Sequence, residues 1–402
     1  MRNIKYFLLG AVLLVACAQS SPAPIQLAPS TTSVVEVLAT STTLASITTI
    51  EPSEHATTPV PAPPSPAPTF TPEVTSTTTS PTPTSQPSTL TPPTPTTDPF
   101  AAYEQFTIPA LRERQARGEF GTEGPIEIVR TLEDTPNFTR QLFAYHGDGL
   151  RLTGMLNRPK GNGPFPVVIL VHGYYPLDVY QTGNGTKLAA DYLASRGFLT
   201  LSPDLRSHAG SDVAPNLFRA GHVLDVLNLI PLAQRLPYAK SGKVGLWGHS
   251  NGGAIAAKVM TISDQVGATV IYSPASLTIA EDYQFRLGRS HPRITQTHGA
   301  RTGVIDTVAI EFPVKADQAP DLYRRLSPLP YVQYATMPIQ IHWGTADETV
   351  PRKWPRDLYD SLQAAGKQVR WFEYPGQPHS FQGAGNQLYL ERIATFYRQW
   401  VA

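Results

Sequence analysis

The stretch GLWGHSNGG, Gly245–Gly253, places one serine, Ser250, between glycines directly after a short apolar run. A G-x-S-x-G pattern is weak by itself, because it arises by chance in about one chain in ten of this length. A nucleophilic serine on a tight turn between strand and helix needs small neighbours, since adjacent chains pass close to its backbone. Gly248 and Gly252 meet that need, so the stretch predicts a strand, a sharp turn and the start of a helix.

The segments around this stretch alternate between strand-like and helix-like patterns. The run PFPVVILVHG, residues 164–173, is continuously apolar, which is typical of a parallel strand covered on both faces. Further strands are expected at 198–204, 243–248, 268–274, 337–344 and 368–376, and helices at 187–195, 222–234, 252–260, 354–364 and 388–400. This alternation predicts the α/β class, with a doubly wound, mostly parallel sheet.

The regular pattern begins near residue 140 and continues to residue 402. Residues 141–159 contain two extended runs joined by HGDG, which predicts a β-hairpin. Residues 99–139 combine a helix-compatible stretch with the alternating run IEIVRTLED, and we expect them to pack on the main domain as an N-terminal extension. Residues from about 277 to 332 break the rhythm where a cap over the carboxyl edge of the sheet would lie. The expected organisation is one domain, 140–402, with an inserted cap.

The first 17 residues, MRNIKYFLLGAVLLVAC, begin with basic side chains and continue as an apolar run too short to span a bilayer, which indicates an export signal. The run ends in LVAC, which resembles the lipobox of bacterial lipoproteins. The resemblance implies that Cys17 becomes the new N-terminus and carries lipid that anchors the protein to the cell membrane. Cys17 is the only cysteine, so we expect no intramolecular disulfide. A catalytic thiol is not expected either, because no histidine lies near Cys17 in the sequence.

Residues 18–98 are rich in Pro, Thr, Ser and Ala and contain no Gly, Lys or Arg. Such a composition buries too little apolar surface to offset the ordering entropy, so we expect a disordered tether. A long tether suits a domain displayed on the cell surface, while glycosylation and the type of cell envelope stay open. The chain has a formal net charge of +1 and 16% charged residues. Without a long basic run, no nucleic-acid partner is expected.

Candidate catalytic residues follow the ends of successive expected strands, where ligands bind in an open parallel sheet. Ser250, Asp347 and His379 each follow one of them. A serine hydroxyl needs a base within hydrogen-bond reach and an acid that orients this base. The chain order Ser–Asp–His selects His379 from ten histidines and is the order of a hydrolase triad. Glu348, the neighbour of Asp347, stays open as an alternative acid.

A tetrahedral intermediate also needs hydrogen-bond donors for its oxyanion. The first expected donor is the backbone N–H of Asn251, because the helix that begins there directs its free N–H groups and positive dipole end at Ser250. The second is the backbone N–H of Tyr174, which follows a strand end at His172 and Gly173. The sequence therefore predicts an oxyanion hole built from two separate strand ends.

Taken together, these motifs resemble the α/β-hydrolase superfamily, in particular its prolyl-oligopeptidase-like and dienelactone-hydrolase-like members. The motifs that carry the resemblance are the HG turn, SPDLRSHAGSD, GHSNGG, GTADETVP and PHSF, and it covers residues 140–402. In some prolyl-oligopeptidase relatives a tyrosine hydroxyl near this strand end donates to the oxyanion, which makes the Tyr174 hydroxyl a further candidate. The large N-terminal propeller of true prolyl oligopeptidases is not expected, because the tether takes its place.

The resemblance and the triad order predict a serine hydrolase that forms an acyl-enzyme on Ser250 and needs no cofactor. Carboxylic esters are favoured over peptides, because ester cleavage requires no recognition of a free amine. A peptidase acting on short peptides stays open, as does a non-catalytic surface binding protein, since fold alone does not establish function. The expected partner is a small ester or a short peptide, while its acyl and alcohol groups and the oligomeric state stay open.

Several other polar residues near the expected site have a structural interpretation. His249 and His172 flank the site, yet no His or Cys spacing typical of zinc appears, so no metal is expected. Together with His208 they are expected to be packing groups. Four arginines of the insertion would either read a substrate carboxylate or form a solvated face of the cap, and the solvated face is favoured; they are Arg286, Arg289, Arg293 and Arg301.

Overall fold

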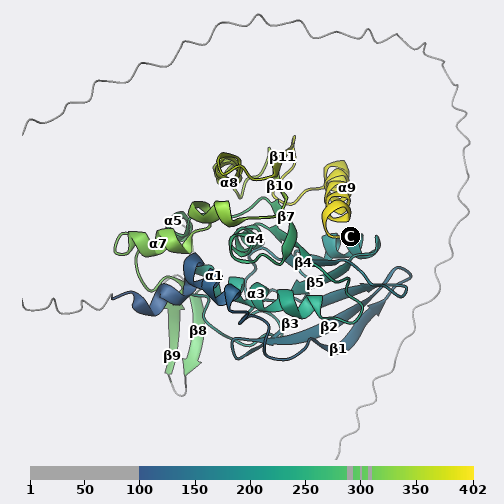
Figure 1. Ribbon diagram of the computed structural model, residues 1–402. Helices are drawn as coiled ribbons and strands as arrows, with labels where there is room; N and C mark the ends of the chain where they lie inside the picture. Colours follow the sequence, from purple (N-terminus) through teal and green to yellow (C-terminus); the bar gives the residue numbers. More distant parts are fainter. Residues whose placement is uncertain (1–98, 288–292, 299–300, 307–309) are drawn as a thin grey trace, which may run out of the picture. The chain divides into compact units, whose positions relative to one another are not determined.

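The computed structural model describes residues 99–402 except 288–292, 299–300 and 307–309 (Figure 1). The expected signal peptide with its lipidation site Cys17 and the expected tether 18–98 lie outside the described residues. Within the described part, no helix combines the length and the apolar composition that crossing a membrane requires.

Nine strands of the described residues form one sheet in the order β1-β2-β3-β5-β4-β6-β7-β10-β11. The neighbours from β1 to β5 are antiparallel and those from β5 to β11 are parallel. Their bounds are Glu127–Asp134 (β1), Phe138–Gly147 (β2), Leu150–Pro159 (β3), Val167–Val171 (β4), Leu199–Pro203 (β5), Val244–His249 (β6), Val266–Tyr272 (β7), Ile339–Gly344 (β10) and Val369–Tyr374 (β11). The mostly parallel α/β sheet predicted from the sequence is confirmed.

The predicted hairpin is formed by β2 and β3, which pair without a register shift. Its turn consists of Asp148 and Gly149, with φ angles of 54° and 74°. Two residues with positive φ give the twist that joins adjacent antiparallel strands through a two-residue loop. The expected extension supplies β1, which pairs with β2 and becomes the edge strand of the main sheet.

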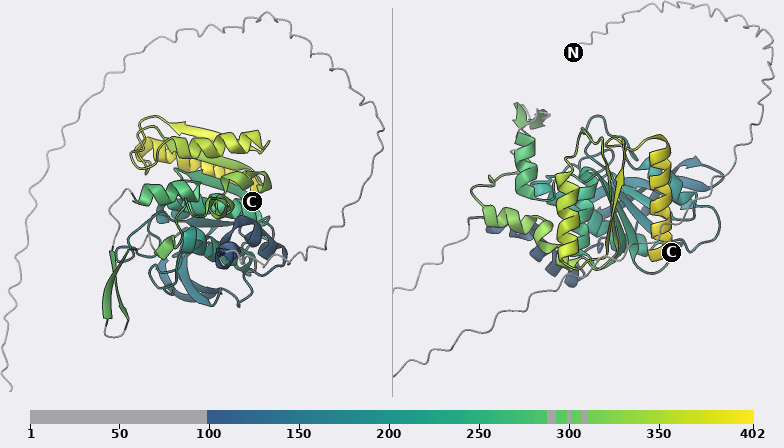
Figure 2. Two further views of the ribbon diagram at one scale, coloured as in Figure 1. Left: turned by 90° about the vertical axis from the view of Figure 1, so that its left-hand side faces the viewer. Right: turned by 90° about the horizontal axis from the view of Figure 1, so that it is seen from above.

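Helices cover both faces of the sheet (Figure 2). One buried apolar cluster joins the sheet to α1, α3, α4 and α8, and a second joins the opposite face to α2 and α9. The helix bounds are Ile108–Ala116 (α1), Lys187–Ala194 (α2), Ala220–Gln234 (α3), Asn251–Ile262 (α4), Ile279–Leu287 (α5), Pro320–Leu326 (α7), Lys353–Ala364 (α8) and Gly383–Trp400 (α9).

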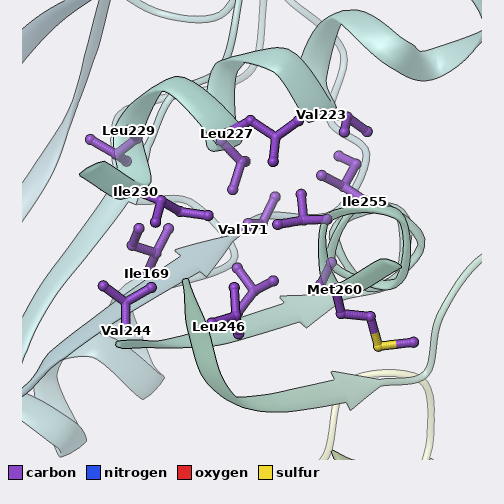
Figure 3. Close-up of a cluster of buried hydrophobic side chains, with 14 of the residues drawn as sticks. Ile169, Val171, Val223, Leu227, Leu229, Ile230, Val244, Leu246, Ile255 and Met260 are labelled. Atoms are coloured by element: carbon purple, nitrogen blue, oxygen red, sulfur yellow. The ribbon is translucent and has the colours of Figure 1, made fainter. Parts of the chain in front are cut away.

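The central strand β4 is apolar at every position because both of its faces are buried. Ile169 and Val171 belong to the cluster on the α3 and α4 side (Figure 3), whereas Val168 and Leu170 belong to the cluster on the α9 side. All four are fully buried. Complete burial of an aliphatic side chain contributes about 1.5–3 kcal/mol. A polar residue at any of these positions would therefore weaken one of the two layers that hold the sheet.

The expected cap contains α5, a hairpin of β8 (Arg293–His298) and β9 (Arg301–Asp306), α7 and the short helix η3 (Leu329–Tyr334). Its apolar side chains form a third cluster together with Phe218, which lies just before α3, and the Phe218 and Tyr323 rings are in contact. The short helix η1 (Ala101–Phe106) of the extension packs against this cluster. The sequence predicted an irregular insertion and did not anticipate the hairpin, nor the contact between extension and cap. Arg289 and the side chains of Arg293 and Arg301 lie outside the described residues.

Candidate active site

Ser250 stands on a strained turn between β6 and α4. Its φ and ψ are 57° and −121°, a combination that costs a residue other than glycine on the order of 1–3 kcal/mol. Two hydrogen bonds hold the turn: the Ser250 N–H donates to the Tyr272 carbonyl at 2.9 Å, and the Ala275 N–H donates to the Ser250 carbonyl at 2.9 Å. Both come from β7 and its following loop, so the neighbouring strand end fixes the serine in place.

The two glycines of this turn are required by close backbone contacts. A Cβ atom on Gly252 would lie 2.1 Å from the Val171 carbonyl oxygen, and one on Gly248 would lie 2.1 Å from the Gly252 carbonyl oxygen. Real Cβ atoms do not approach oxygen so closely, and the opposing atoms are backbone that cannot rotate away. The need for small neighbours around the serine, inferred from the sequence, therefore has a direct steric cause.

Asp347 and His379 lie at the ends of the adjacent strands β10 and β11 and contact each other. The His379 Nδ1–H donates to the Asp347 carboxylate, with distances of 2.9 Å to Oδ2 and 3.1 Å to Oδ1. The Asp347 side chain is fully buried, and its Oδ1 also accepts the backbone N–H groups of Thr349 and Val350. Burial raises the pKa of Asp347, but these hydrogen bonds outweigh it, so the net pKa is lowered and the carboxylate is ionised near neutral pH.

His249 supports the backbone of His379. Its Nε2–H donates to the His379 carbonyl oxygen at 3.0 Å, and its ring stacks on Tyr272 with centroids 4.2 Å apart. Burial lowers the pKa of His249 to about 3, so the ring is neutral. The ring centroids of His249 and His379 are 4.7 Å apart, which brings His379 beside the turn that carries Ser250. Among the described hydrogen bonds there is none between Ser250 Oγ and His379 Nε2, and such contacts often tighten only when substrate binds.

The expected oxyanion donors border Ser250 from two sides. Asn251 is the first residue of α4, so its backbone N–H has no acceptor inside the helix. The strand end before Tyr174 passes close to the serine, because a Cβ atom on Gly173 would lie 3.2 Å from the Ser250 Cβ atom. Tyr174 itself is half exposed. The structure thus brings together all five expected site residues, and their catalytic roles stay predictions.

His172 and His208 pack against each other and against the Tyr180 ring. Their ring centroids are 5.0 Å apart, and His172 lies within hydrogen-bond distance of the Gly173 and Asp204 carbonyl oxygens. Burial lowers the pKa of His172 to about 4, so its neutral ring donates to one of these two oxygens. Among the described residues, no group of three or more His, Cys, Asp or Glu is arranged to hold a metal ion.

Two charged residues that border the site were not predicted from the sequence. Arg219 donates through Nη2 to the Asn251 side-chain oxygen, and Glu311 of the cap lies 3.5 Å from Arg219 Nη1. No local pattern in the sequence marks either residue. The solvated interpretation of Arg286 is wrong, because its side chain is only 18% exposed and is paired with Asp282.

Replacing Asp347 with asparagine should lower kcat by about 10³ to 10⁴. The oxygen that accepts two backbone N–H groups would remain in place, so the new NH₂ group would face His379 Nδ1 and donate to it. The imidazole would then carry its proton on Nε2 and lose its function as a base. Steady-state kinetics on a short nitrophenyl ester tests this expectation.

The matched control is Glu348→Gln, which removes the neighbouring charge from an exposed side chain. Its kcat should stay within about twofold of the parent value, because a surface substitution away from specific contacts has little effect. A larger loss from Glu348→Gln than from Asp347→Asn would assign the acid to Glu348 instead.

Comparison with known proteins gives a family and a fold. A model of the prolyl oligopeptidase family matches residues 185–402, which is more than half of the chain. Esterase EstD of Thermotoga maritima is 26% identical over 229 residues, which cover 52% of this chain and 53% of EstD. The chain thus spans about half the length of this curated relative.

Two solved structures are similar in fold. Acetyl xylan esterase 1 from Thermoanaerobacterium sp. JW/SL YS485 has a TM-score of 0.55 and 16% identity, covering 73% of this chain and 94% of that chain. The acylaminoacyl peptidase of Pyrococcus horikoshii has a TM-score of 0.54 and 20% identity, covering 68% of this chain and 44% of that chain. At these identities the likeness shows the fold alone, and the predicted α/β-hydrolase fold is confirmed.

Proposed function

Because the chain belongs to the prolyl oligopeptidase family, we propose that it is a serine hydrolase that cleaves carboxylic esters through an acyl-enzyme on Ser250. The observation that carries the proposal is the geometry of three strand ends at one edge of the sheet, those of β6, β10 and β11. Ser250 stands on a strained turn after β6, and a buried Asp347 holds the His379 imidazole beside that turn. A base held by a buried acid and placed beside a serine is the arrangement that activates the hydroxyl.

In the proposed reaction, Ser250 Oγ attacks the ester carbonyl carbon while His379 Nε2 takes the hydroxyl proton. Asp347 accepts the Nδ1–H of the resulting imidazolium and stabilises its charge. The tetrahedral intermediate collapses, and the departing alcohol takes the proton from His379. Water then attacks the acyl-enzyme with His379 as base, and the carboxylic acid leaves. No step requires a cofactor.

The oxyanion of the intermediate would be held by the backbone N–H groups of Asn251 and Tyr174. Removing one such donor typically costs about 10² to 10³ in kcat, so two donors account for a large part of the rate. The N-terminus of α4 adds a positive dipole end at the same point.

Ester hydrolysis is favoured over peptide hydrolysis for two reasons. An alcohol leaves more easily than an amine, so esters require less precise recognition of the leaving group. The similar protein EstD is named an esterase and its match covers half of the chain. The family description and the fold of the acylaminoacyl peptidase support the second candidate, a peptidase acting on short peptides.

Labelling with a fluorophosphonate tests the proposal, because this reagent reacts with activated serines. We expect one covalent adduct on the full-length protein, mapped by mass spectrometry to the peptide that contains Ser250. The same preparation should hydrolyse short nitrophenyl esters and leave X-Pro-nitroanilides nearly untouched. A preference for the anilides would establish the peptidase. Folded protein without any adduct would favour the non-catalytic binding protein.

A further inference from the structure

Five charged side chains gather beside Asn251, at the border between the hydrolase core and the cap. They come from the start of α3, from α4, from α5 and from the cap segment that precedes α7; they are Arg219, Lys258, Asp282, Arg286 and Glu311. Three of them are cationic groups and two are carboxylates. Burial lowers the pKa of Lys258 to about 7, so the lasting positive charges of the cluster are the two arginines. The cluster lies next to Asn251, whose backbone N–H is a proposed oxyanion donor.

Arg219 is the most constrained member. Its side chain is 7% exposed, and its backbone is left-handed with a φ of 61°, directly after Phe218 with a φ of 48°. Two consecutive strained residues are unusual and cost on the order of 1–3 kcal/mol each. Its Nη2 donates to Asn251, while its buried Nε has no hydrogen-bond partner. A guanidinium has five N–H donors, so these contacts do not fill the hydrogen-bonding capacity of Arg219.

Glu311 lies loosely between two guanidinium groups. Its Oε2 is 3.5 Å from Arg219 Nη1 and 3.8 Å from Arg286 Nη1, and both distances exceed an ordinary N–H···O hydrogen bond. Its side chain is 23% exposed. A carboxylate thus already occupies the space between the two arginines, but its contacts leave room for a better-placed anion.

Arg286 connects this cluster to the mouth of the site. Asp282 holds its Nε at 3.1 Å, and its guanidinium carbon lies 6.0 Å from the centre of the Tyr174 ring. Arg219 therefore contacts the side chain of Asn251, and Arg286 lies near the ring of Tyr174; these are the two residues whose backbone N–H groups are the proposed oxyanion donors. His379 has different neighbours from the two arginines, because it contacts Asp347 and His249. Since the alcohol must leave toward His379, the arginines face the acyl part of the substrate.

A small cavity next to Asn251 is too small to bind the acyl group of the substrate. It has a volume of about 20 Å³ and is lined by Arg219, Lys258 and Asp282 among others. A volume of this size holds about one water molecule and no acyl chain. The Lys258 Nζ atom donates to the Phe218 carbonyl oxygen at 3.3 Å. An acyl group must therefore lie on the side of the cluster where Glu311 is partly exposed.

We propose that Arg219 and Arg286 form a subsite for a carboxylate on the acyl group, so that the substrates are monoesters of dicarboxylic acids. The substrate carboxylate takes the place between the two guanidinium groups and displaces Glu311. This inference rests on the proposed serine hydrolase function and specifies its substrate class. Planar guanidinium groups that bind a carboxylate through paired N–H donors give both energy and orientation.

The test compares two esters of equal chain length, mono-4-nitrophenyl glutarate and 4-nitrophenyl pentanoate. The measured quantity is the ratio of kcat/KM for the anionic ester to kcat/KM for the neutral ester. We expect Arg286→Gln to lower this ratio at least about tenfold, the usual effect of a lost charged hydrogen bond. Glu311→Gln should raise it several-fold, because it removes the competing carboxylate. The two variants act in opposite directions, so a general loss of stability would not imitate both.

Arg324→Gln is the matched control, since the exposed Arg324 side chain on α7 pairs with Asp321 and belongs to no contact of the cluster. This variant should leave the ratio unchanged. Equal losses on both esters in Arg286→Gln, or a lowered ratio in Glu311→Gln, would overturn the proposal. Faster hydrolysis of an alanine nitrophenyl ester by the parent, lost in Glu311→Gln, would overturn it by showing that Glu311 binds a substrate ammonium group.

The experiment also separates this inference from the proposed function. If the parent protein hydrolyses the pentanoate and takes a fluorophosphonate on Ser250 but does not prefer the glutarate, the subsite is absent while the hydrolase remains. If it hydrolyses neither ester and takes no label, the proposed function itself fails.

Discussion

Ser250→Ala is expected to lower kcat by a factor on the order of 10⁶, since removal of the nucleophile leaves only substrate binding and the oxyanion donors. The loss should concern the chemical step alone. Ser250 donates and accepts through its backbone N–H and carbonyl, and alanine retains both groups. Alanine also tolerates the φ of 57° about as well as serine does. The thermal unfolding midpoint should therefore stay nearly unchanged, and fluorophosphonate labelling should disappear.

Ser263→Ala is a control from the same helix. Ser263 follows the last residue of α4, as Ser250 precedes the first, and its side chain accepts the Gln265 N–H at 3.2 Å. Its loss should cost about 1 kcal/mol of stability, the usual contribution of one hydrogen bond, and leave kcat intact. If Ser250→Ala kept a substantial rate while Ser263→Ala did not, the nucleophile would be misassigned.

The predictability of the fold follows from how its strands are buried. Strands such as β4 are covered on both faces and therefore have continuous apolar sequences that identify them. Helix α9 was expected from residue 388 but begins at Gly383, because the stretch GAGNQ has no large apolar side chain that would mark a buried face. The cap hairpin was missed for a related reason, since its sequence shows no regular alternation of apolar and polar residues.

The catalytic candidates were accessible from sequence because each follows a strand that ends at the same edge of the sheet. The sequence left Glu348 open as an alternative to Asp347, because the direction of each side chain depends on the backbone of one turn. In the structure the Asp347 carboxylate accepts the N–H of Val350 and points at His379, while Glu348 is exposed. A difference of one position in a turn changes the direction of a side chain without changing the motif.

The charged cluster beside Asn251 could not be predicted from the sequence for another reason. Arg219 and Glu311 are far apart in the chain and meet only because the cap folds back onto the start of α3. Arg286 was expected on a solvated face, yet the carboxylates of Asp282 and Glu311 allow it to be buried. The local sequence does not distinguish a buried arginine that is paired with carboxylates from an arginine on the surface.

His379→Ala is expected to lower kcat by nearly the same factor as Ser250→Ala, on the order of 10⁶, because a serine without its base is no nucleophile. Fluorophosphonate labelling of Ser250 should also be lost. This joint loss would separate a base from a residue that only binds substrate, because loss of a binding group changes KM and leaves the serine reactive. Kinetics and labelling on one preparation give both results.

A histidine of the same domain supplies the control for this prediction. His146 lies exposed on β2, and His146→Ala should retain both kcat and labelling. The buried Asp347 makes a further distinction: without the imidazole its carboxylate loses the His379 hydrogen bond and keeps the N–H groups of Thr349 and Val350. His379→Ala should therefore fold with only a modest loss of stability. A folded His379→Ala variant that still takes the label would show that another group activates Ser250, and the assignment of the base would have to be abandoned.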